Sequence, residues 1–213
     1  IETQRGFVQG RNLVNNVVDL DAAARAASRV IPRQLMIPLE NVGTLLELCK
    51  KYNFDPATLP ILHFWDYASA FPSLLHEWLF MVLKITGVPH GFCNLIRLIY
   101  SSFAVMIKLT TGLEFAFFIL CGVIQGCPLS GTLFAIGVEP ILILLNRTVG
   151  TASLPPPLDL RSERGVFRAC ADDIGALIRR LDVLVEIAKV FDDAAPLSGL
   201  RLGLRKCQIV PLA

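Results

Sequence analysis

The chain has 213 residues and a formal net charge of +2, from 20 lysines and arginines against 18 aspartates and glutamates. This length suits one domain with a substantial core and room for a small second lobe. The near balance of charge excludes a strongly basic protein overall, although a basic groove for nucleic acid can exist within a balanced total. Hydrophobic residues make up 54% of the chain and mean hydropathy is +0.57, which indicates extensive burial, missing partner segments or a membrane protein.

The N-terminal quarter predicts two helices and a proline-rich stretch. Residues 11–30 predict an amphipathic helix, because apolar side chains recur at helical spacing. Its apolar face is formed by Leu13, Val17, Leu20 and Ala24. Asp19 and Asp21 point to different sides of this helix, so we expect both to be solvated. A second helix is expected around residues 39–51. No secretory signal is expected, because residues 1–11 are polar and charged, and the missing initiator Met indicates a piece of a longer protein.

The centre of the chain predicts a strand, two helices and a hairpin. The sequence ILHFWD is typical of a buried strand that ends at Asp66. Pro72 is well placed as the first residue of a helix. That helix carries an apolar stripe of Leu74, Leu75, Trp78, Leu79, Val82 and Leu83. Residues 87–102 predict a second helix, and residues 103–123 predict a hairpin that turns near residues 111–112.

Residues 115–138 form an uncharged stretch long enough to span a bilayer. Polar and helix-breaking residues interrupt its middle, in the sequence VIQGCPLSGT. Two shorter elements joined by a polar turn explain the stretch better, with a helix that begins at Pro128 and bends near Pro140. An integral membrane protein remains the alternative.

The segment VFRACADDIGALI, residues 166–178, places Asp172 and Asp173 between two apolar runs. Each run predicts a short buried strand, so the aspartates fall where a two-residue hairpin turn is expected. Such turns favour Asn-Gly or Asp-Gly, and two adjacent carboxylates repel each other unless a positive charge lies between them. The pair therefore indicates a nearby cation.

The C-terminal residues predict a helix over 181–196 and a last pair of strands within 200–212. A second acidic pair, Asp192 and Asp193, follows a helical stretch and is expected to be solvated. Hairpin-joined strands together with helices indicate an α+β fold, in which an antiparallel sheet is backed by helices on one face.

The six cysteines include no CxxC pair, and no histidine stands at zinc-ligand spacing. Free thiols in a reducing compartment are therefore expected, which favours an intracellular location, in the nucleus or the cytoplasm. His63, His76 and His90 are scattered, and structural roles are expected for all three.

Three aspartates stand at strand ends or turns: Asp66, Asp172 and Asp173. If their strands are neighbours, the three carboxylates meet at one edge of the sheet, where they suit hard divalent cations. Two such ions about 4 Å apart can activate an attacking hydroxyl and stabilise a leaving pyrophosphate. A surface turn remains the alternative for any one of these residues alone.

Three segments in chain order, FWDYASAF, GVIQGCPLSGTLF and ACADDIGALI, resemble motifs A, B and C of reverse transcriptases, in particular those of non-long-terminal-repeat (LINE-type) retrotransposons. The opening QRGFVQGRNLVNN is similar to a late fingers motif of that family, and SGLRLGLRKCQIV to its motif D. The resemblance implies a polymerase palm over residues 58–213 and partial fingers over residues 1–57, with an insertion near residues 30–57.

The resemblance implies roles for single residues at the carboxylate cluster. Asp66 and Asp172 would bind two catalytic Mg²⁺ ions, or Mn²⁺ in their place, together with Asp173 and the backbone carbonyl of Tyr67. Phe71 matches the aromatic steric gate that selects deoxynucleotides, with an ordinary core ring as the alternative.

Four further positions match family motifs. Gln125 and Gly126 match the motif B turn that holds the incoming nucleotide and the template base. Lys206 matches a lysine that protonates the leaving pyrophosphate, and Arg11 matches a fingers arginine. The alternative for Gln125 and Gly126 is a plain turn at the start of a helix. The alternative for Lys206 and Arg11 is a solvated basic side chain.

The resemblance implies an RNA-directed DNA polymerase that takes an RNA template, a DNA primer and dNTPs, with no membrane partner. The thumb and an endonuclease domain are expected in a larger polyprotein. Cys170 and Pro72 depart from the family pattern, which usually has an aromatic residue and often an Asp there. A catalytically inactive remnant of the same fold is the main alternative, and an RNA-directed RNA polymerase, against which Phe71 speaks, is less favoured.

Overall fold

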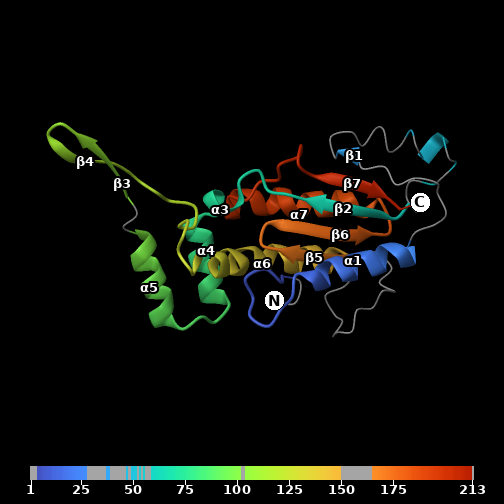
Figure 1. Cartoon of the computed structure of the whole chain (residues 1–213), viewed down its shortest axis with the longest axis horizontal. Helices are drawn as coiled ribbons and strands as arrows, with labels where there is room; N and C mark the ends of the chain where they lie inside the picture. The colour runs from blue at the N-terminus through green and yellow to red at the C-terminus, as the bar shows by residue number, and fades with distance from the viewer. Residues whose placement is uncertain are drawn as a thin grey trace.

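The protein is built on a five-stranded antiparallel sheet, in a computed structural model that describes residues 4–27, 37–38, 47, 49–51, 53, 55, 59–101, 104–149 and 165–212. The strands of the sheet are β1 (Ile37–Pro38), β2 (Ile61–Trp65), β5 (Gly165–Cys170), β6 (Asp173–Ile178) and β7 (Gln208–Pro211). Their spatial order is β1-β7-β2-β6-β5, and each neighbouring pair is antiparallel. The central position of β2 brings it beside strands that follow it by more than a hundred residues (Figure 1).

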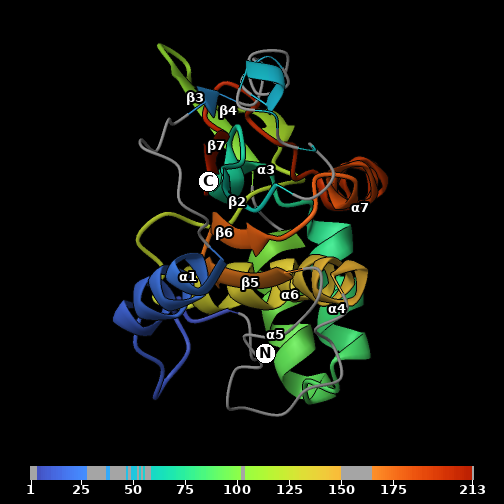
Figure 2. The same ribbon diagram turned by 90° about the vertical axis from the view of Figure 1, so that its right-hand side faces the viewer.

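Helices cover both faces of this sheet, so the prediction of helices on one face is wrong. The helices are α1 (Val14–Ala27), α3 (Ala70–Ser73), α4 (His76–Ile85), α5 (His90–Ser101), α6 (Ser130–Thr148) and α7 (Val183–Ser198). Figure 2 shows α1 on one side of β5 and β6, with α6 and α7 on the other. The physical reason is that β6 is apolar on both faces: Ile174 and Ala176 join the main core, while Leu177 joins a second cluster with Ala23 and Ala27 of α1.

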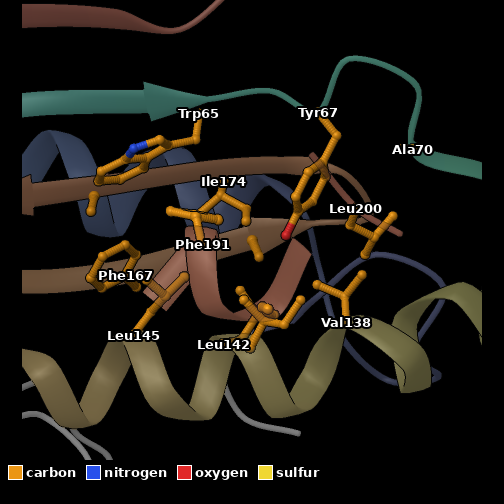
Figure 3. Packing of buried hydrophobic residues seen from close by; sticks show 14 of the residues in the cluster. Trp65, Tyr67, Ala70, Val138, Leu142, Leu145, Phe167, Ile174, Phe191 and Leu200 are labelled. Atoms are coloured by element: carbon orange, nitrogen blue, oxygen red, sulfur yellow. The ribbon is translucent and has the colours of Figure 1, made fainter. Parts of the chain in front are cut away.

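Aromatic rings fill the main core between the sheet and the α6–α7 layer. The Trp65 ring stacks on Phe167 with ring centroids 5.3 Å apart, and Phe191 of α7 lies 5.9 Å from Trp65. Leu142 and Leu145 of α6 close this layer from below (Figure 3). The core therefore joins β2, β5, α6 and α7, and gives the strand ends a rigid base.

The predicted helix over residues 11–30 is present as α1, and its predicted apolar face is buried in part: Ala24 is buried and Leu20 is half-buried. Leu13 and Val17 are exposed, whereas Ala23 and Ala27 are buried. Small side chains allow the helix backbone to approach the sheet closely, which the larger residues would prevent. Asp19, expected to be solvated, is also largely buried, in an ion-pair network described below.

The predicted helix from Pro72 is divided into two. The short α3 contains Pro72 and ends at Ser73, and α4 begins at His76. Between them the amide of Leu75 donates to the carbonyl of Ser198 at the end of α7, so a tertiary hydrogen bond interrupts the helix.

The predicted hairpin is confirmed as β3 (Ala104–Leu109) and β4 (Gly112–Phe118), which form a separate two-stranded sheet. The helix predicted over residues 87–102 is confirmed as α5. The hairpin projects away from the five-stranded sheet (Figure 1).

The uncharged stretch of residues 115–138 belongs to two elements joined by a turn, as predicted: β4 and α6. The helix begins at Ser130, two residues later than expected, and continues through Pro140 to Thr148. Of the helices that the structure describes, α6 alone has the length and apolar composition to cross a membrane, and 56% of its most apolar window is buried in the protein. A core helix of a globular domain meets the same description.

The C-terminal predictions are partly confirmed. The helix α7 forms and runs through Pro196 to Ser198, with Asp192 and Asp193 exposed as expected. The predicted last strand pair is instead one strand, β7, paired with β2, and an isolated bridge between Leu202 and Tyr67. The helix predicted around residues 39–51 and the insertion predicted near residues 30–57 lie largely outside the described residues.

Candidate active site

The register of the central strands brings the three predicted aspartates to one end of the sheet. Trp65 of β2 pairs with Ile174 of β6 in antiparallel register. Asp66 follows Trp65 directly and Asp173 precedes Ile174. Both therefore lie at the same end of the sheet, where β2 ends and β6 begins. Asp172 stands in the loop that joins β5 to β6. The expectation that distant carboxylates share one sheet edge is confirmed.

The hairpin turn differs from the prediction by one residue. Cys170 and Asp173 form the last pair of the β5–β6 ladder, so the two-residue loop is Ala171–Asp172 rather than Asp172–Asp173. Ala171 takes the left-handed conformation, with φ of +55°. That conformation is uncommon for a residue other than glycine, asparagine or aspartate. The shift places Asp172 at the tip and Asp173 on the strand.

Negative charge at this edge is poorly compensated. Burial, followed by the charges of Asp172 and Asp66, raises the pKa of Asp173, and the nearby ammonium of Lys206 lowers it only in part. The pKa of the Cys170 thiol is raised too, first by burial and then by Asp173 and Asp172. Carboxylates that oppose each other's ionisation in this way favour a bound cation.

Lys206 supplies the one cation that contacts a catalytic candidate among the described residues. Its ammonium lies 3.4 Å from Oδ1 of Asp66 and donates to the backbone carbonyl of Tyr67 at 3.1 Å. These are the two oxygen donors that the sequence predicts as metal ligands at the end of β2. The Lys206 ammonium therefore lies between two oxygen donors of the kind that hard divalent cations prefer. No three acidic, histidine or cysteine side chains of the described residues converge tightly enough to bind a metal as they stand.

The segment that carries Lys206 is held against the end of β2 by its backbone. The amide of Gly203 donates to the carbonyl of Asp66 at 2.8 Å, and the amide of Ala68 donates to the carbonyl of Arg201 at 2.9 Å. A β-carbon on Gly203 would lie 3.1 Å from the α-carbon of Ala68. This close backbone contact holds Lys206 at a distance from which its side chain reaches Asp66.

Tyr67 contributes its carbonyl to the site and its side chain to the core (Figure 3). Its hydroxyl is buried and has no hydrogen-bond partner in the described part of the chain. Burial, and to a lesser degree the charge of Asp172, raise the pKa of this phenol.

Phe71 lies in a stack of three aromatic rings. Its ring stacks on Phe134 of α6, with centroids 4.4 Å apart and planes 13° from parallel, and the Phe7 ring lies nearly perpendicular to it, with centroids 6.3 Å apart. Phe71 is half-buried, whereas Phe134 is fully buried. The Phe7 ring also covers Gly131, where any β-carbon would collide with it. The core-ring alternative and the predicted gate role are both compatible with this half-exposed position.

The predicted motif B turn is present at Gln125–Gly126, where Gly126 has a φ of +84° and both residues are exposed. No atom lies within 4 Å of a β-carbon built on Gly126, so the turn requires glycine for its backbone conformation. The segment before the turn is tied to Phe71, because the amide of Val123 donates to its carbonyl at 2.9 Å. The roles of Gln125 and Gly126 stay predictions.

Arg11 contacts the N-terminal segment: its guanidinium donates to the carbonyl of Gln4 at 3.0 Å. Sequence reasoning did not select Gln4, which is buried and hydrogen-bonded to the Ala171–Asp172 loop. It also missed the network of Arg5, Asp19 and Arg168. No periodicity marks these residues; the one signal for Gln4 is its place in the segment QRGFVQGR.

Comparison with known sequences identifies relatives along nearly the whole chain. The family described as "Reverse transcriptase (RNA-dependent DNA polymerase)" matches residues 2–212. The transposon TX1 uncharacterized 149 kDa protein of Xenopus laevis is 32% identical over 165 residues, which cover 78% of this chain and 12% of that protein. The retrovirus-related Pol polyprotein from type-1 retrotransposable element R2 of Bradysia coprophila is 30% identical over 147 residues, 69% of this chain and 16% of that protein. The chain therefore spans less than a fifth of these relatives.

Solved structures of similar fold include two telomerases. Apo telomerase from Candida tropicalis, truncated from its C-terminal domain, superposes with a TM-score of 0.51 at 16% identity, covering 97% of this chain and 42% of that chain. Telomerase from Candida albicans, in complex with a fragment of telomeric RNA, gives a TM-score of 0.50 at 11% identity over 92% of this chain and 32% of that chain. At these identities the likeness concerns the fold alone.

Proposed function

Since the chain belongs to the reverse transcriptase family, with retrotransposon proteins of the non-long-terminal-repeat type as relatives, we propose that it extends a DNA primer on an RNA template, with Asp66, Asp172 and Asp173 as its catalytic carboxylates. The observation that carries this proposal is the antiparallel register of β2 and β6, which gathers these residues at one end of the sheet. The larger proteins of which such a domain is part would supply the thumb and an endonuclease.

The proposed cofactor is a pair of Mg²⁺ ions, or Mn²⁺ in their place, held by the three carboxylates and the carbonyl of Tyr67. All of these donors are hard oxygens, which suit such ions. Asp66 and Tyr67 already share the ammonium of Lys206, which supports a cation at that point. When bound, the ions activate the attacking 3′-hydroxyl and neutralise charge on the leaving pyrophosphate. Lys206, which lies beside Asp66 and the carbonyl of Tyr67, would give a proton to the leaving pyrophosphate.

The proposed substrates are dNTPs, selected by the ring of Phe71. Its stack on Phe134 keeps the ring in one orientation, so that a ribose 2′-hydroxyl would meet a fixed surface. Gln125 and Gly126 would hold the nucleotide and template base, and Arg11 would act in the adjoining fingers segment. Phe71→Val should raise ribonucleotide use about tenfold or more, and Phe134→Leu, which removes the stacking partner of Phe71, should raise it by a smaller factor.

Primer extension on poly(rA)–oligo(dT) with Mg²⁺ tests the activity. Asp172→Asn should abolish dTTP incorporation, since it removes a ligand charge at the loop tip. Asp192→Asn is the matched control, because it makes the same change in the exposed acidic pair of α7. Equal incorporation by the wild type and Asp172→Asn would contradict the assignment, and no incorporation by any variant would favour the inactive remnant.

We also propose an intracellular location. All six cysteines are free, and thiols persist unpaired in reducing compartments. Imaging of the tagged full-length protein in the nucleus or the cytoplasm would test this; secretion into the medium would contradict it.

A further inference from the structure

The side chain of Gln4 closes a ring of hydrogen bonds around the loop that carries Asp172. Its Nε2 donates to the carbonyl of Ala171 at 3.0 Å, and its Oε1 accepts from the amide of Ala171 at 2.9 Å. The same oxygen accepts from the amide of Gly6 at 2.8 Å. Gln4 has no exposed surface, so water cannot replace these bonds at low cost.

The loop needs such support because of its backbone conformation. Ala171 has a φ of +55°, a region that costs an alanine roughly 1 kcal/mol or more and persists only where surrounding contacts impose it. Both backbone groups of Ala171 bond to Gln4, and the described residues offer no other hydrogen bond to them. Asp172 follows immediately, so the conformation of Ala171 sets its direction.

The backbone around Gln4 is itself fixed to β5. Gln4 forms a parallel bridge with Ala169, and the amide of Arg5 donates to the carbonyl of Ala169 at 3.0 Å. Gly6 lies so close to the loop that a β-carbon on it would be 2.6 Å from the amide nitrogen of Ala171. The guanidinium of Arg11 holds the carbonyl of Gln4. The carboxamide is thus presented to the loop from a rigid support.

We propose that Gln4 is a positioning residue for the catalytic carboxylates: its carboxamide holds Ala171 in the left-handed conformation and so aims Asp172 at the metal ions. This inference rests on the proposed function for its catalytic meaning, whereas the effect of Gln4 on the loop stands on hydrogen bonds alone. It predicts that loss of the carboxamide weakens divalent-metal affinity without any change in the carboxylates themselves.

Gln4→Met tests the proposal, because methionine keeps the length of the side chain and removes all three bonds. Gln9→Met is the matched control: it makes the same substitution five residues on, at an exposed position of the same segment. In the 213-residue chain, amide exchange at Ala171 should quicken about tenfold or more in Gln4→Met, as expected for lost buried hydrogen bonds, and stay unchanged in Gln9→Met. Mn²⁺ affinity, measured from the free-ion signal by electron paramagnetic resonance, should fall several-fold in Gln4→Met alone.

A second substitution separates aiming of the loop from a general loss of stability. Ala171→Gly removes the penalty of the left-handed conformation, so it should restore most of the Mn²⁺ affinity in the Gln4→Met background. Where Gln4→Met folds poorly, Gln4→Asn serves instead, since it keeps a neutral carboxamide but is one methylene too short to bond both backbone groups of Ala171.

Each result bears on a distinct claim. Exchange and Mn²⁺ affinity in Gln4→Met equal to those of Gln9→Met would overturn the inference, as would a loss of affinity that Ala171→Gly does not restore. If the wild type binds Mn²⁺ no better than Asp172→Asn, the proposed metal site itself fails and the positioning role fails with it. In that case faster exchange at Ala171 in Gln4→Met would still show that the bonds to the loop are real.

Discussion

The ammonium nitrogen of Lys206 lies 3.4 Å from a carboxylate oxygen of Asp66, a pairing between residues 140 positions apart. The same positive charge lowers the pKa of Asp173, yet burial and the charges of Asp172 and Asp66 outweigh it. One lysine therefore faces three carboxylates, and the edge of the sheet keeps an excess of negative charge. Because of this excess, ionisation of Asp173 should lower the stability of the metal-free protein as the pH rises.

Asp173→Asn should stabilise the metal-free protein at neutral pH. The folded-state pKa of Asp173 is raised above its ordinary value of 3.8, so the folded state binds this proton more tightly than the unfolded state, and ionisation costs stability. The cost is present above the folded-state pKa and disappears as the pH falls toward 3.8. Because the carboxyl is only partly shielded and stays largely in contact with solvent, screening limits the gain to less than about 1 kcal/mol. Urea denaturation at neutral and at acidic pH measures it.

The control for this prediction is Asp192→Asn, in the exposed acidic pair of α7, which should leave the free energy of unfolding unchanged at both pH values. A gain in Asp173→Asn that is equal at neutral and acidic pH would contradict the electrostatic explanation.

Asp19→Asn should destabilise the fold by about 3 kcal/mol, because it leaves two largely buried guanidinium groups without a counter-charge. One oxygen of Asp19 accepts from Arg5 at 2.9 Å and from Arg168 at 2.8 Å, and the side chain of Asp19 is 15% exposed. The bonds tie the N-terminal segment and α1 to β5. Thermal and urea denaturation give the free energy of unfolding.

Asp21→Asn is the matched control two residues further along α1. Its partner is Arg25, and both side chains are more than half exposed. Such surface pairs contribute little, so the loss should stay below about 0.5 kcal/mol. Equal losses for the two substitutions would contradict the buried network.

Tyr67→Phe should raise stability by about 1 kcal/mol, since it removes a buried hydroxyl that has no partner among the described residues. Tyr100 provides the contrast: it is also buried, but its hydroxyl accepts from the amide of Ile124 at 3.4 Å. Tyr100→Phe should therefore cost about 0.5–1 kcal/mol. Chemical denaturation of both variants decides the matter, and a loss in Tyr67→Phe would mean that its hydroxyl has a partner in solution.

The effect of Gly131→Ala on the free energy of unfolding should depend on residue 7. It should be destabilising with Phe7 present and stabilising with alanine at that position. In the wild type the new methyl group collides with the ring of Phe7, and the ring must leave its place beside Phe71. In a Phe7→Ala background the collision is absent, and alanine should stabilise α6 by up to about 1 kcal/mol through its higher helix propensity. A double-mutant cycle with unfolding free energies measures the coupling. Additive effects would contradict the contact between Phe7 and Gly131.

The local pattern of the sequence was sufficient to predict most of the strands and helices that form the site. Strand β2 and the β5–β6 hairpin follow from short apolar runs, and α5 and α6 from helical spacing and punctuation by glycine and proline. The same runs correctly place Asp66 at the end of a strand and Asp172 in a hairpin turn, whereas Asp173, also expected in the turn, begins β6. These features depend on the chemistry of neighbouring residues, which the sequence states directly.

Only the tertiary structure decided the register of the turn, the buried face of α1 and the environment of its aspartates. Ala171 occupies the left-handed position because Gln4 bonds to it from 167 residues away, and no local pattern encodes such a bond. Asp19 is largely buried and Asp21 is exposed, because only the first faces Arg168 on β5. The sequence by itself determines which segments form strands and helices, through short-range sterics and apolar periodicity. The folded chain decides which polar groups meet, because each of those contacts depends on the free energy of packing the whole sheet.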